Sequence, residues 1–315
     1  MKKILFLLGI LLGTVCQAAW PDRPVKIIVP FGAGGGNDAI TRIVAQELAI
    51  IWRVPVIVEN KPGADSLIGS ALVARSDPDG YTLLSNSVSS VAAAQAIRTN
   101  NQFNWETDLV TIGFLGFGPP FIVATSSKNK ITTLDQLKNL GQIRALTFGS
   151  AGVGGSLYLY GEELARAMGV KGIHVPYKAA PQAVLDVING NVDYVVFPQS
   201  STYPHVVSGA LTALAIVSDR PSHALLNVPT IRAMGYQNFP QLSVTYNLIG
   251  PRGMPADIQK KIGEDTAQAV RIVRQQLLDR KLIDDQKAPS LAELNLMSIQ
   301  DGKIWHGLSK KYHEK

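Results

Sequence analysis

The sequence predicts an α/β protein made of two lobes, and three observations support this fold class. Short apolar runs alternate with amphipathic segments from Trp20 onward. This order of elements occurs twice along the chain, and strands that alternate with helices form mainly parallel sheets covered on both faces. In each half, a strand leads through a glycine-rich turn into a helix.

The first lobe is predicted from the pattern of residues 25 to 84. Residues 25–29 form a short β-branched run, typical of a buried strand. Further strands are expected over 54–58 and 81–84, and helices over 38–52 and 66–74.

The second lobe repeats the pattern between residues 144 and 217. Strands are expected over 144–148, 173–177, 194–197 and 211–217, and helices over 157–168, 181–189 and 203–208. Two apolar stretches, 113–124 and 241–250, are expected to be strands that carry the chain between lobes. Helices are expected to begin at Pro255, a residue suited to a helix N-terminus, and over 290–305. We therefore assign 19–118 and 241–315 to the first lobe and 119–240 to the second.

The N-terminus has the pattern of a secretory signal peptide. Lys2 and Lys3 precede an apolar run over 4–15, which is too short to cross a bilayer, and small residues follow it. We expect residues 1–18 to be removed after Ala18, leaving a periplasmic protein. Two alternatives are a lipoprotein anchored at Cys16 and a buried N-terminal helix.

Composition excludes several function classes. Cys16 is the only cysteine, so the mature chain would have no disulfide, thiolate metal site or cysteine nucleophile. The five histidines lack paired metal-ligand spacing, so no metal is expected. The net charge is +6, with the basic residues scattered rather than clustered, which argues against a nucleic-acid partner. A mild positive excess suits an anionic ligand, although an ordinary solvated surface explains it equally well.

The two glycine-rich turns, 30–38 and 149–156, are the candidate ligand sites. Glycine lets backbone N–H groups approach an anion, and the following helix presents its unpaired N–H groups and positive dipole end. Turns of this kind lie at the carboxyl ends of parallel strands, where ligands gather. The alternative is that the glycines only permit tight turns. Asp38 is expected to cap its helix or fix the loop, because an acid would repel an anionic ligand.

Both turns also come close to nucleotide-binding motifs. Gly32 and Gly34 begin a dinucleotide fingerprint, but Asn37 stands where the third glycine belongs, while Glu59 suits a ribose-binding acid. An exported NAD-dependent oxidoreductase therefore stays open as an alternative. The second turn lacks the lysine of a phosphate-binding loop. There is no Gly-x-Ser-x-Gly elbow, and a Ser/His/Asp set assembled from distant positions stays open.

Several segments in order resemble the substrate-binding receptors of tripartite tricarboxylate transporters, the Bug-type receptors. The matching segments span most of the chain: 30–38 (PFGAGGGND), 58–64 (VENKPGA), 78–84 (PDGYTLL), 149–152 (GSAG), 174–178 (HVPYK), 228–230 (VPT) and 251–255 (PRGMP).

The resemblance implies a type II periplasmic binding protein fold, with two lobes, a ligand cleft and two crossing strands. It implies a small carboxylate ligand, held largely by backbone N–H groups and water. Carried over by position, the ligand contacts in the first lobe would be Phe31, Gly34, Gly35, Gly36, Ser85, Asn86 and Ser87, with Asp38 in support. Those in the second lobe would be Ser150, Ala151, Gly152, Gly154, Gly155 and Ser156.

The chain departs from the family pattern at the far end of the cleft. Asp65-Ser66-Leu67 stands where Gly-Gly-Asn is frequent, Phe197-Pro198 where Asp-Asn is frequent, and Thr245-Tyr246 in a region that often holds a tryptophan. Phe197 and Gln199 are therefore expected at the wall that selects the far end of the ligand.

The expected function is a monomeric solute-binding receptor, not an enzyme, without cofactor. It would deliver a carboxylate to the membrane permease of a tripartite tricarboxylate transporter. A receptor that reports to a membrane sensor is a further alternative, because a ligand-closed shape can dock on either partner.

Overall fold

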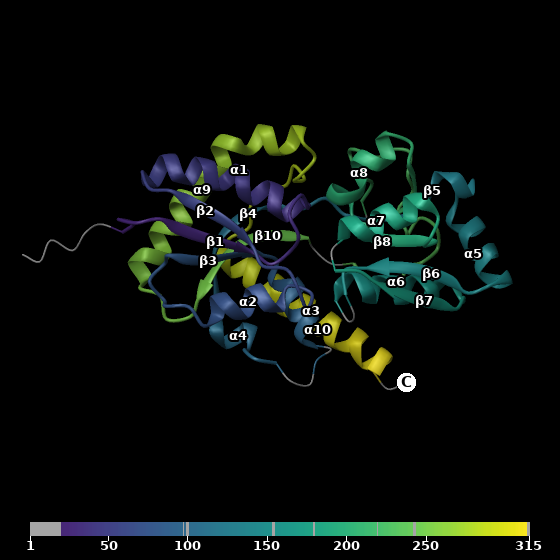
Figure 1. Cartoon of the computed structure of the whole chain (residues 1–315), viewed down its shortest axis with the longest axis horizontal. Helices are drawn as coiled ribbons and strands as arrows, with labels where there is room; N and C mark the ends of the chain where they lie inside the picture. The colour runs from purple at the N-terminus through teal and green to yellow at the C-terminus, as the bar shows by residue number, and fades with distance from the viewer. Residues whose placement is uncertain are drawn as a thin grey trace, which may run out of the picture.

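The computed structural model describes residues 20–96, 98, 101–152, 155–178, 180–218, 220–241 and 244–313. The predicted signal peptide and Gly154 lie outside these residues. Within them the chain forms two lobes, each around its own sheet (Figure 1).

The sheet of the first lobe has the strand order β2-β1-β3-β10-β4. Its strands are β1 (Val25–Val29), β2 (Val56–Asn60), β3 (Thr82–Asn86), β4 (Leu109–Phe117) and β10 (Thr245–Pro251). Strand β1 pairs in parallel with β2 and β3, whereas β10 runs antiparallel between β3 and β4.

The second sheet has the order β7-β6-β8-β5-β9. Its strands are β5 (Phe121–Ser126), β6 (Leu146–Ser150), β7 (Gly172–Pro176), β8 (Tyr194–Pro198) and β9 (Leu211–Val217). Strand β6 pairs in parallel with β7 and β8, and β5 runs antiparallel between β8 and β9. The two sheets therefore share one topology. In each sheet the fourth strand in spatial order, β10 or β5, runs antiparallel to both of its neighbours.

The chain crosses between the lobes twice at neighbouring positions. Strand β4 ends at Phe117 beside Thr245, the first residue of β10, while Phe121 opens β5 beside Val217, the last residue of β9. The two-lobe α/β fold with two crossing strands is thus confirmed.

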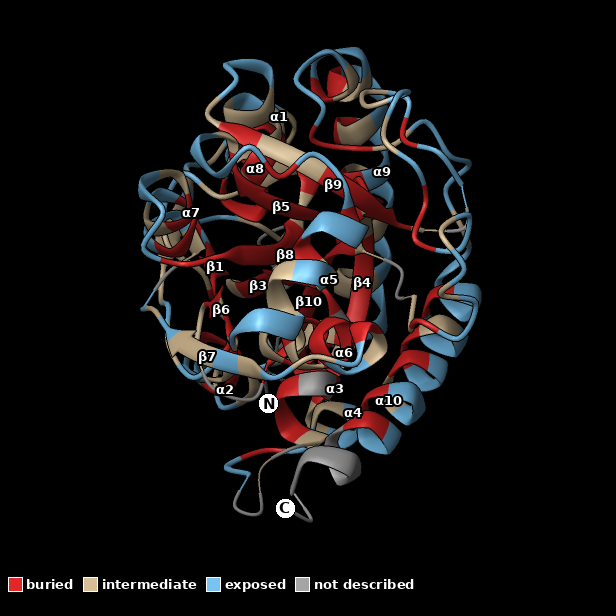
Figure 2. Ribbon diagram, turned by 90° about the vertical axis from the view of Figure 1, so that its right-hand side faces the viewer, coloured by how far each residue is buried: buried red, intermediate tan, exposed pale blue. Residues whose placement is uncertain are grey.

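Helices cover both faces of each sheet, as the apolar strands require. On the first sheet, α1 (Gly36–Trp52) and α9 (Ala256–Asp279) pack on one face. The other face carries α2 (Leu67–Ala74), α3 (Val88–Ala96) and α4 (Trp105–Asp108). On the second sheet, α5 (Leu134–Ile143) and α6 (Ser156–Met168) lie opposite α7 (Ala180–Asn189) and α8 (Gln199–Val207). A 3₁₀ turn spans Ser127–Asn129. Figure 2 shows buried strands inside and exposed outer helix faces.

Helix α10 (Leu291–His313) links the two lobes. It packs beside α3 and β4 of the first lobe, and it passes beneath the junction in Figure 1. Its Trp305 and Leu308 belong to the apolar cluster of the second lobe. The division of the lobes at residues 119 and 241 stays a prediction. Although residues 241–315 were assigned to the first lobe, α10 also contributes to the core of the second lobe.

Three strands extend two residues beyond their predicted ends, β8 and β10 extend one, and three helices were not predicted. Strands β2, β3 and β6 each run two residues further, to Asn60, Asn86 and Ser150. These polar ends are held by partners from the neighbouring helix and loop. Helices α3, α4 and α5 were missed, although Thr133 and Gln136 form a capping box at the start of α5.

Candidate functional site

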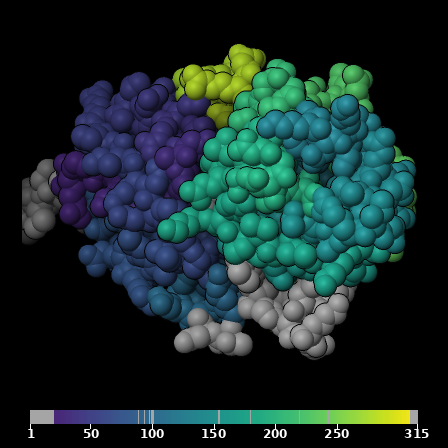
Figure 3. Space-filling model, turned by 45° about the vertical axis from the view of Figure 1, so that its right-hand side comes forward, coloured from purple at the N-terminus to yellow at the C-terminus, as the bar shows by residue number. Residues whose placement is uncertain are grey.

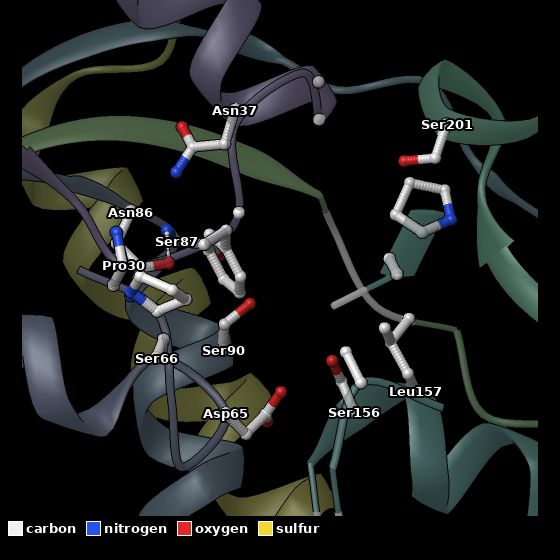
Figure 4. A pocket seen from close by; sticks show the side chains of 18 of the residues that line it. Pro30, Asn37, Asp65, Ser66, Asn86, Ser87, Ser90, Ser156, Leu157 and Ser201 are labelled. Atoms are coloured by element: carbon white, nitrogen blue, oxygen red, sulfur yellow. Dashed lines mark hydrogen bonds between the residues drawn. The ribbon is translucent and has the colours of Figure 1, made fainter. Parts of the chain in front are cut away.

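A cleft between the two lobes is the candidate site. The empty space in it is about 1100 Å³, a volume that includes open solvent. In a space-filling view the purple and blue first lobe meets the green and teal second lobe along one seam (Figure 3). Residues of both lobes line the cleft, and the two predicted glycine-rich turns face each other across it (Figure 4).

The first glycine-rich turn ends at the N-terminus of α1. Gly35 is the N-cap, so the N–H groups of Gly36, Asn37 and Asp38 are the first of the helix and have no intrahelical acceptor. Gly36 and Asn37 line the cleft. These N–H groups and the positive end of the helix dipole therefore form a wall whose electrostatics favour an anion.

Asp38 fixes this turn from behind. Its Oδ2 accepts from the backbone N–H of Gly34 at 2.9 Å, and its carboxylate also accepts from Arg42 Nε at 3.0 Å and from Asn60 Nδ2 at 2.9 Å. Burial alone would raise the pKa of the Asp38 carboxyl, but these hydrogen bonds and the charge of Arg42 hold it below the ordinary value. Asp38 is therefore ionised and fully engaged, and it shapes the turn without facing the cleft.

A buried polar network joins α1 to the end of β3. Asn37 Nδ2 donates to the Ser85 carbonyl at 2.7 Å, and Ser85 Oγ donates to Asn37 Oδ1 at 3.0 Å. Thr41 Oγ1 lies 2.6 Å from Ser85 Oγ. Ser85 is thus a support, and Asn86 and Ser87 beyond it reach the cleft.

The second glycine-rich turn runs from β6 to α6, whose N-cap is Gly155. Ser150 Oγ donates to the Gly152 carbonyl at 2.5 Å and lies 2.6 Å from His174 Nε2. Burial lowers the pKa of His174 to about 4, so its imidazole is neutral at neutral pH. Ser150 is fully buried, so its hydroxyl braces the turn and is not exposed to a ligand.

Besides the packing of α10 on the second lobe, the lobes touch at two glycines beside the cleft. Gly36 of α1 lies against Ser200 of α8, where a Cβ atom at position 36 would stand 2.8 Å from the Ser200 Cβ. Asp65 of the first lobe lies against Gly155, where an added Cβ would overlap the Asp65 carboxylate. Because both contacts join opposite lobes, this conformation is a closed one.

The structure divides the predicted contacts into three groups. Seven line the cleft: Phe31, Gly35, Gly36, Asn86, Ser87, Ala151 and Ser156. Six belong to or support the turns without lining the cleft: Gly34, Asp38, Ser85, Ser150, Gly152 and Gly155. Gly154 lies outside the described residues. The contact of each with a ligand stays a prediction.

Phe197 and Gln199 do not form the far wall, which corrects that expectation. Alternate residues of β8 face opposite sides of the sheet, and Phe197 points into the apolar cluster under α7, where it is fully buried. Gln199 Oε1 accepts from Ser222 Oγ at 2.5 Å, inside the lobe. Pro198 and Ser201 line the cleft instead.

Sequence reasoning missed several lining residues. They include Asp65, Ser66, Ser89, Ser90, Lys178, Ser201, Tyr246 and Trp305, whereas Pro30 and Asn37 lie within the predicted turn 30–38 without being named as contacts. In the sequence, Asp65, Ser66 and Tyr246 stand out only as departures from a family pattern. Trp305 carried no local signal, because it reaches the cleft from a helix far along the chain.

Among the described residues, no group of three or more His, Cys, Asp or Glu side chains could hold a metal ion. No described helix is both long and apolar enough to cross a membrane. The cleft wall is made mainly of glycine, serine and proline, and the charged side chains among its described residues are Asp65 and Lys178.

Comparisons with known proteins agree on one family. The profile of the family described as "Tripartite tricarboxylate transporter family receptor" matches residues 40–287. The protein BugT of Bordetella pertussis is 32% identical over 264 residues, which cover 80% of each chain.

Two solved structures show the same fold. The periplasmic binding protein BugD is 25% identical with a TM-score of 0.82, over 93% of this chain and 98% of its own. MatC from Rhodopseudomonas palustris, solved with bound malate, is 24% identical with a TM-score of 0.84, over 92% of this chain and 100% of its own.

Proposed function

The chain belongs to the tripartite tricarboxylate transporter receptor family, and we propose that it is a periplasmic receptor that closes its two lobes around a small organic carboxylate. The observation that carries this proposal is the N-terminus of α1 at the wall of the interlobe cleft. There the backbone N–H groups of Gly36 and Asn37 lie beside a cavity without an intrahelical acceptor.

A carboxylate suits this wall for electrostatic reasons. The helix dipole and unpaired N–H groups favour an anion, and the absence of a side chain at Gly35 and Gly36 permits close approach. Asp38 holds the turn in place through the Gly34 N–H. Binding of malate by MatC is consistent with this ligand class.

Closure follows from the placement of the site between the lobes. A ligand that touches both lobes binds the closed state more tightly than the open one, so it shifts the population toward closure. The neighbouring crossings at β4–β5 and β9–β10 provide the hinge, because the main chain passes between the lobes at these two adjacent places. The closed shape is then the signal that a membrane partner reads.

Export and delivery are part of the proposal. The signal pattern of residues 1–18 supports export, and Trp20, just beyond it, already packs edge-on against Trp52 with ring centroids 5.1 Å apart. Membership of a transporter receptor family supports delivery to a permease of the same system.

The test is a thermal-shift screen of protein that has been unfolded and refolded to remove bound ligand. The panel contains citrate, dicarboxylates of four to six carbons, nicotinate, benzoate-type acids, acidic and ω-amino acids, and NAD. A ligand at about 100 times its Kd should add about 2.7 kcal/mol to the free energy of unfolding. For a chain of this size we expect the melting temperature to rise by a few degrees.

Two results would contradict the proposal. A response to NAD alone would favour an oxidoreductase. Chemical conversion of a bound carboxylate, detected by mass spectrometry, would favour another enzyme. Stabilisation by one class of carboxylate, recovered unchanged, would support the receptor.

A further inference from the structure

Asp65 stands in an unusual loop at the entrance to α2. Ala64, Asp65 and Ser66 all adopt left-handed backbone conformations, with φ of 48°, 51° and 76°. Each such non-glycine residue costs about 1–2 kcal/mol, and a run of them persists only where the surroundings require it. Contacts of the loop with its surroundings therefore hold it in this strained conformation.

The loop directs the Asp65 carboxylate across the cleft to the second lobe. There the backbone N–H of Ser156, at the N-terminus of α6, is its hydrogen-bond donor. Figure 4 shows the two residues pointing toward each other from opposite lobes. Gly155 is needed beside them, because any Cβ at that position would overlap the carboxylate.

This carboxylate is buried and incompletely paired. Asp65 is only 8% exposed, and within the described residues its Oδ2 atom has no hydrogen-bond partner. Burial raises the pKa of Asp65 to about 6, although the Arg98 charge and the Ser156 N–H act in the opposite direction. A buried carboxylate with a free oxygen is costly unless a donor or a cation completes its coordination.

The two anion-binding helix ends of the cleft are therefore not equivalent. The end of α1 is free for the ligand, whereas the end of α6 already holds a carboxylate that belongs to the protein. A second carboxylate on the ligand would meet Asp65, and like charges facing each other across an interface are unfavourable. An ammonium group beside Asp65 would instead bring a charge opposite to that of the carboxylate.

We propose that Asp65 selects carboxylates that carry an ammonium group at their far end and disfavours dicarboxylates. This inference rests on the proposed function, since it assigns the first carboxylate to the α1 wall. Lys178, the other charged side chain of the lining, is exposed at the rim, so solvent screens its attraction for a second carboxylate.

The test compares ligands of matched length by calorimetry. One series is succinate, succinamate and 4-aminobutyrate, and the other is glutarate, glutaramate and 5-aminopentanoate. In the wild type we expect the ω-amino acid to bind at least about tenfold more tightly than the dicarboxylate of the same length, with the amide between them.

Two variants test whether Asp65 causes this order. Asp65→Asn keeps the size of the side chain and removes its charge, and Asp65→Ser removes both the charge and the crowding near Gly155. We expect either variant to reduce the preference at least about tenfold. Asp77→Asn, an equal charge change at an exposed position, should leave the preference unchanged.

The outcomes separate the inference from the proposed function. Equal or tighter binding of dicarboxylates by the wild type, or an unchanged preference in the Asp65 variants, overturns the role of Asp65 and leaves the carboxylate receptor standing. A wild type that binds no carboxylate of the series or of the wider screen overturns the proposed function itself.

Discussion

Substitution of Gly36 by alanine tests whether binding depends on closure of the lobes. The added Cβ would lie 2.8 Å from the Ser200 Cβ and 3.1 Å from the Tyr246 hydroxyl oxygen. Carbon atoms pack best at about 3.5–4.0 Å, so the closed state must shift to accept the methyl group. Overpacking of this kind costs about 1–3 kcal/mol.

The cost applies mainly to the closed state, because Ser200 belongs to the opposite lobe. We therefore expect Gly36→Ala to weaken ligand binding about 5- to 150-fold, with little change in the melting temperature of the ligand-free protein. Calorimetry with the best ligand of the screen measures the affinity. Gly307→Ala, on the exposed face of α10 with no atom near the added methyl group, is the matched control and should bind normally.

A double variant distinguishes closure from a direct clash with the ligand. Gly36→Ala with Ser200→Gly removes the opposing Cβ and should recover most of the lost affinity. Wild-type affinity in the single variant would refute the closure argument. An equal loss in the double variant would show that alanine obstructs the ligand itself.

Three further predictions concern the support of the cleft and the stability of the fold. Asp38→Asn weakens the hydrogen bond from the Gly34 N–H and should weaken ligand binding about five- to tenfold. Asp257→Asn, which changes an exposed acid in the first turn of α9, is the control and should leave binding unchanged. Equal effects of the two substitutions in calorimetry would refute the positioning role of Asp38. Burial raises the pKa of Asp301 to about 6 against the opposing Ser89 hydrogen bond, so between pH 4 and 6 the folded state binds more protons than the unfolded chain. The free energy of unfolding should therefore fall by up to about 3 kcal/mol as the pH rises from 4 to 6. Urea titrations at a series of pH values should find a smaller fall in Asp301→Asn. Phe197→Asp places a charge in the apolar cluster under α7 and should lower the free energy of unfolding by at least about 3 kcal/mol, measured in urea. A variant that is as stable as the wild type but prefers other ligands would show that Phe197 lies at the cleft wall after all.

Much of the fold followed from local patterns. The run at residues 25–29 is a buried strand because its side chains enter apolar clusters on both sheet faces, and the spacing of residues 38–52 matches the buried face of α1. These elements carry their own periodicity, so neighbouring residues are sufficient to identify them.

Strand ends were harder to predict because distant partners stabilise them. Asn60 and Ser85 are polar residues typical of turns, yet they complete β2 and β3. Asn60 is held by the Phe31 carbonyl and Asp38, and Ser85 by Asn37. No local signal in the sequence reports such bonds across 22 to 48 positions.

The site was predictable where glycine has a backbone role and not where side chains converge from afar. Both glycine-rich turns could be placed from local sequence, because a turn between a strand and a helix lies at the carboxyl end of the strand, and residues of both line the candidate cleft. The far wall was not, since a single residue decides which face of β8 a side chain occupies. In the sequence, Asp65 is visible only as a departure from the family pattern. Its role could not be predicted, because its approach to Ser156 depends on how the lobes close.

The central claim is that the α1 wall of the cleft recognises a carboxylate. The most direct test is calorimetry of the refolded protein with the best acid of the screen and with its analogue in which that carboxylate is a primary amide. We predict one-to-one binding of the acid and at least about tenfold weaker binding of the amide, because the helix end and its N–H groups favour negative charge. Equal affinity for the acid and the amide would contradict the claim.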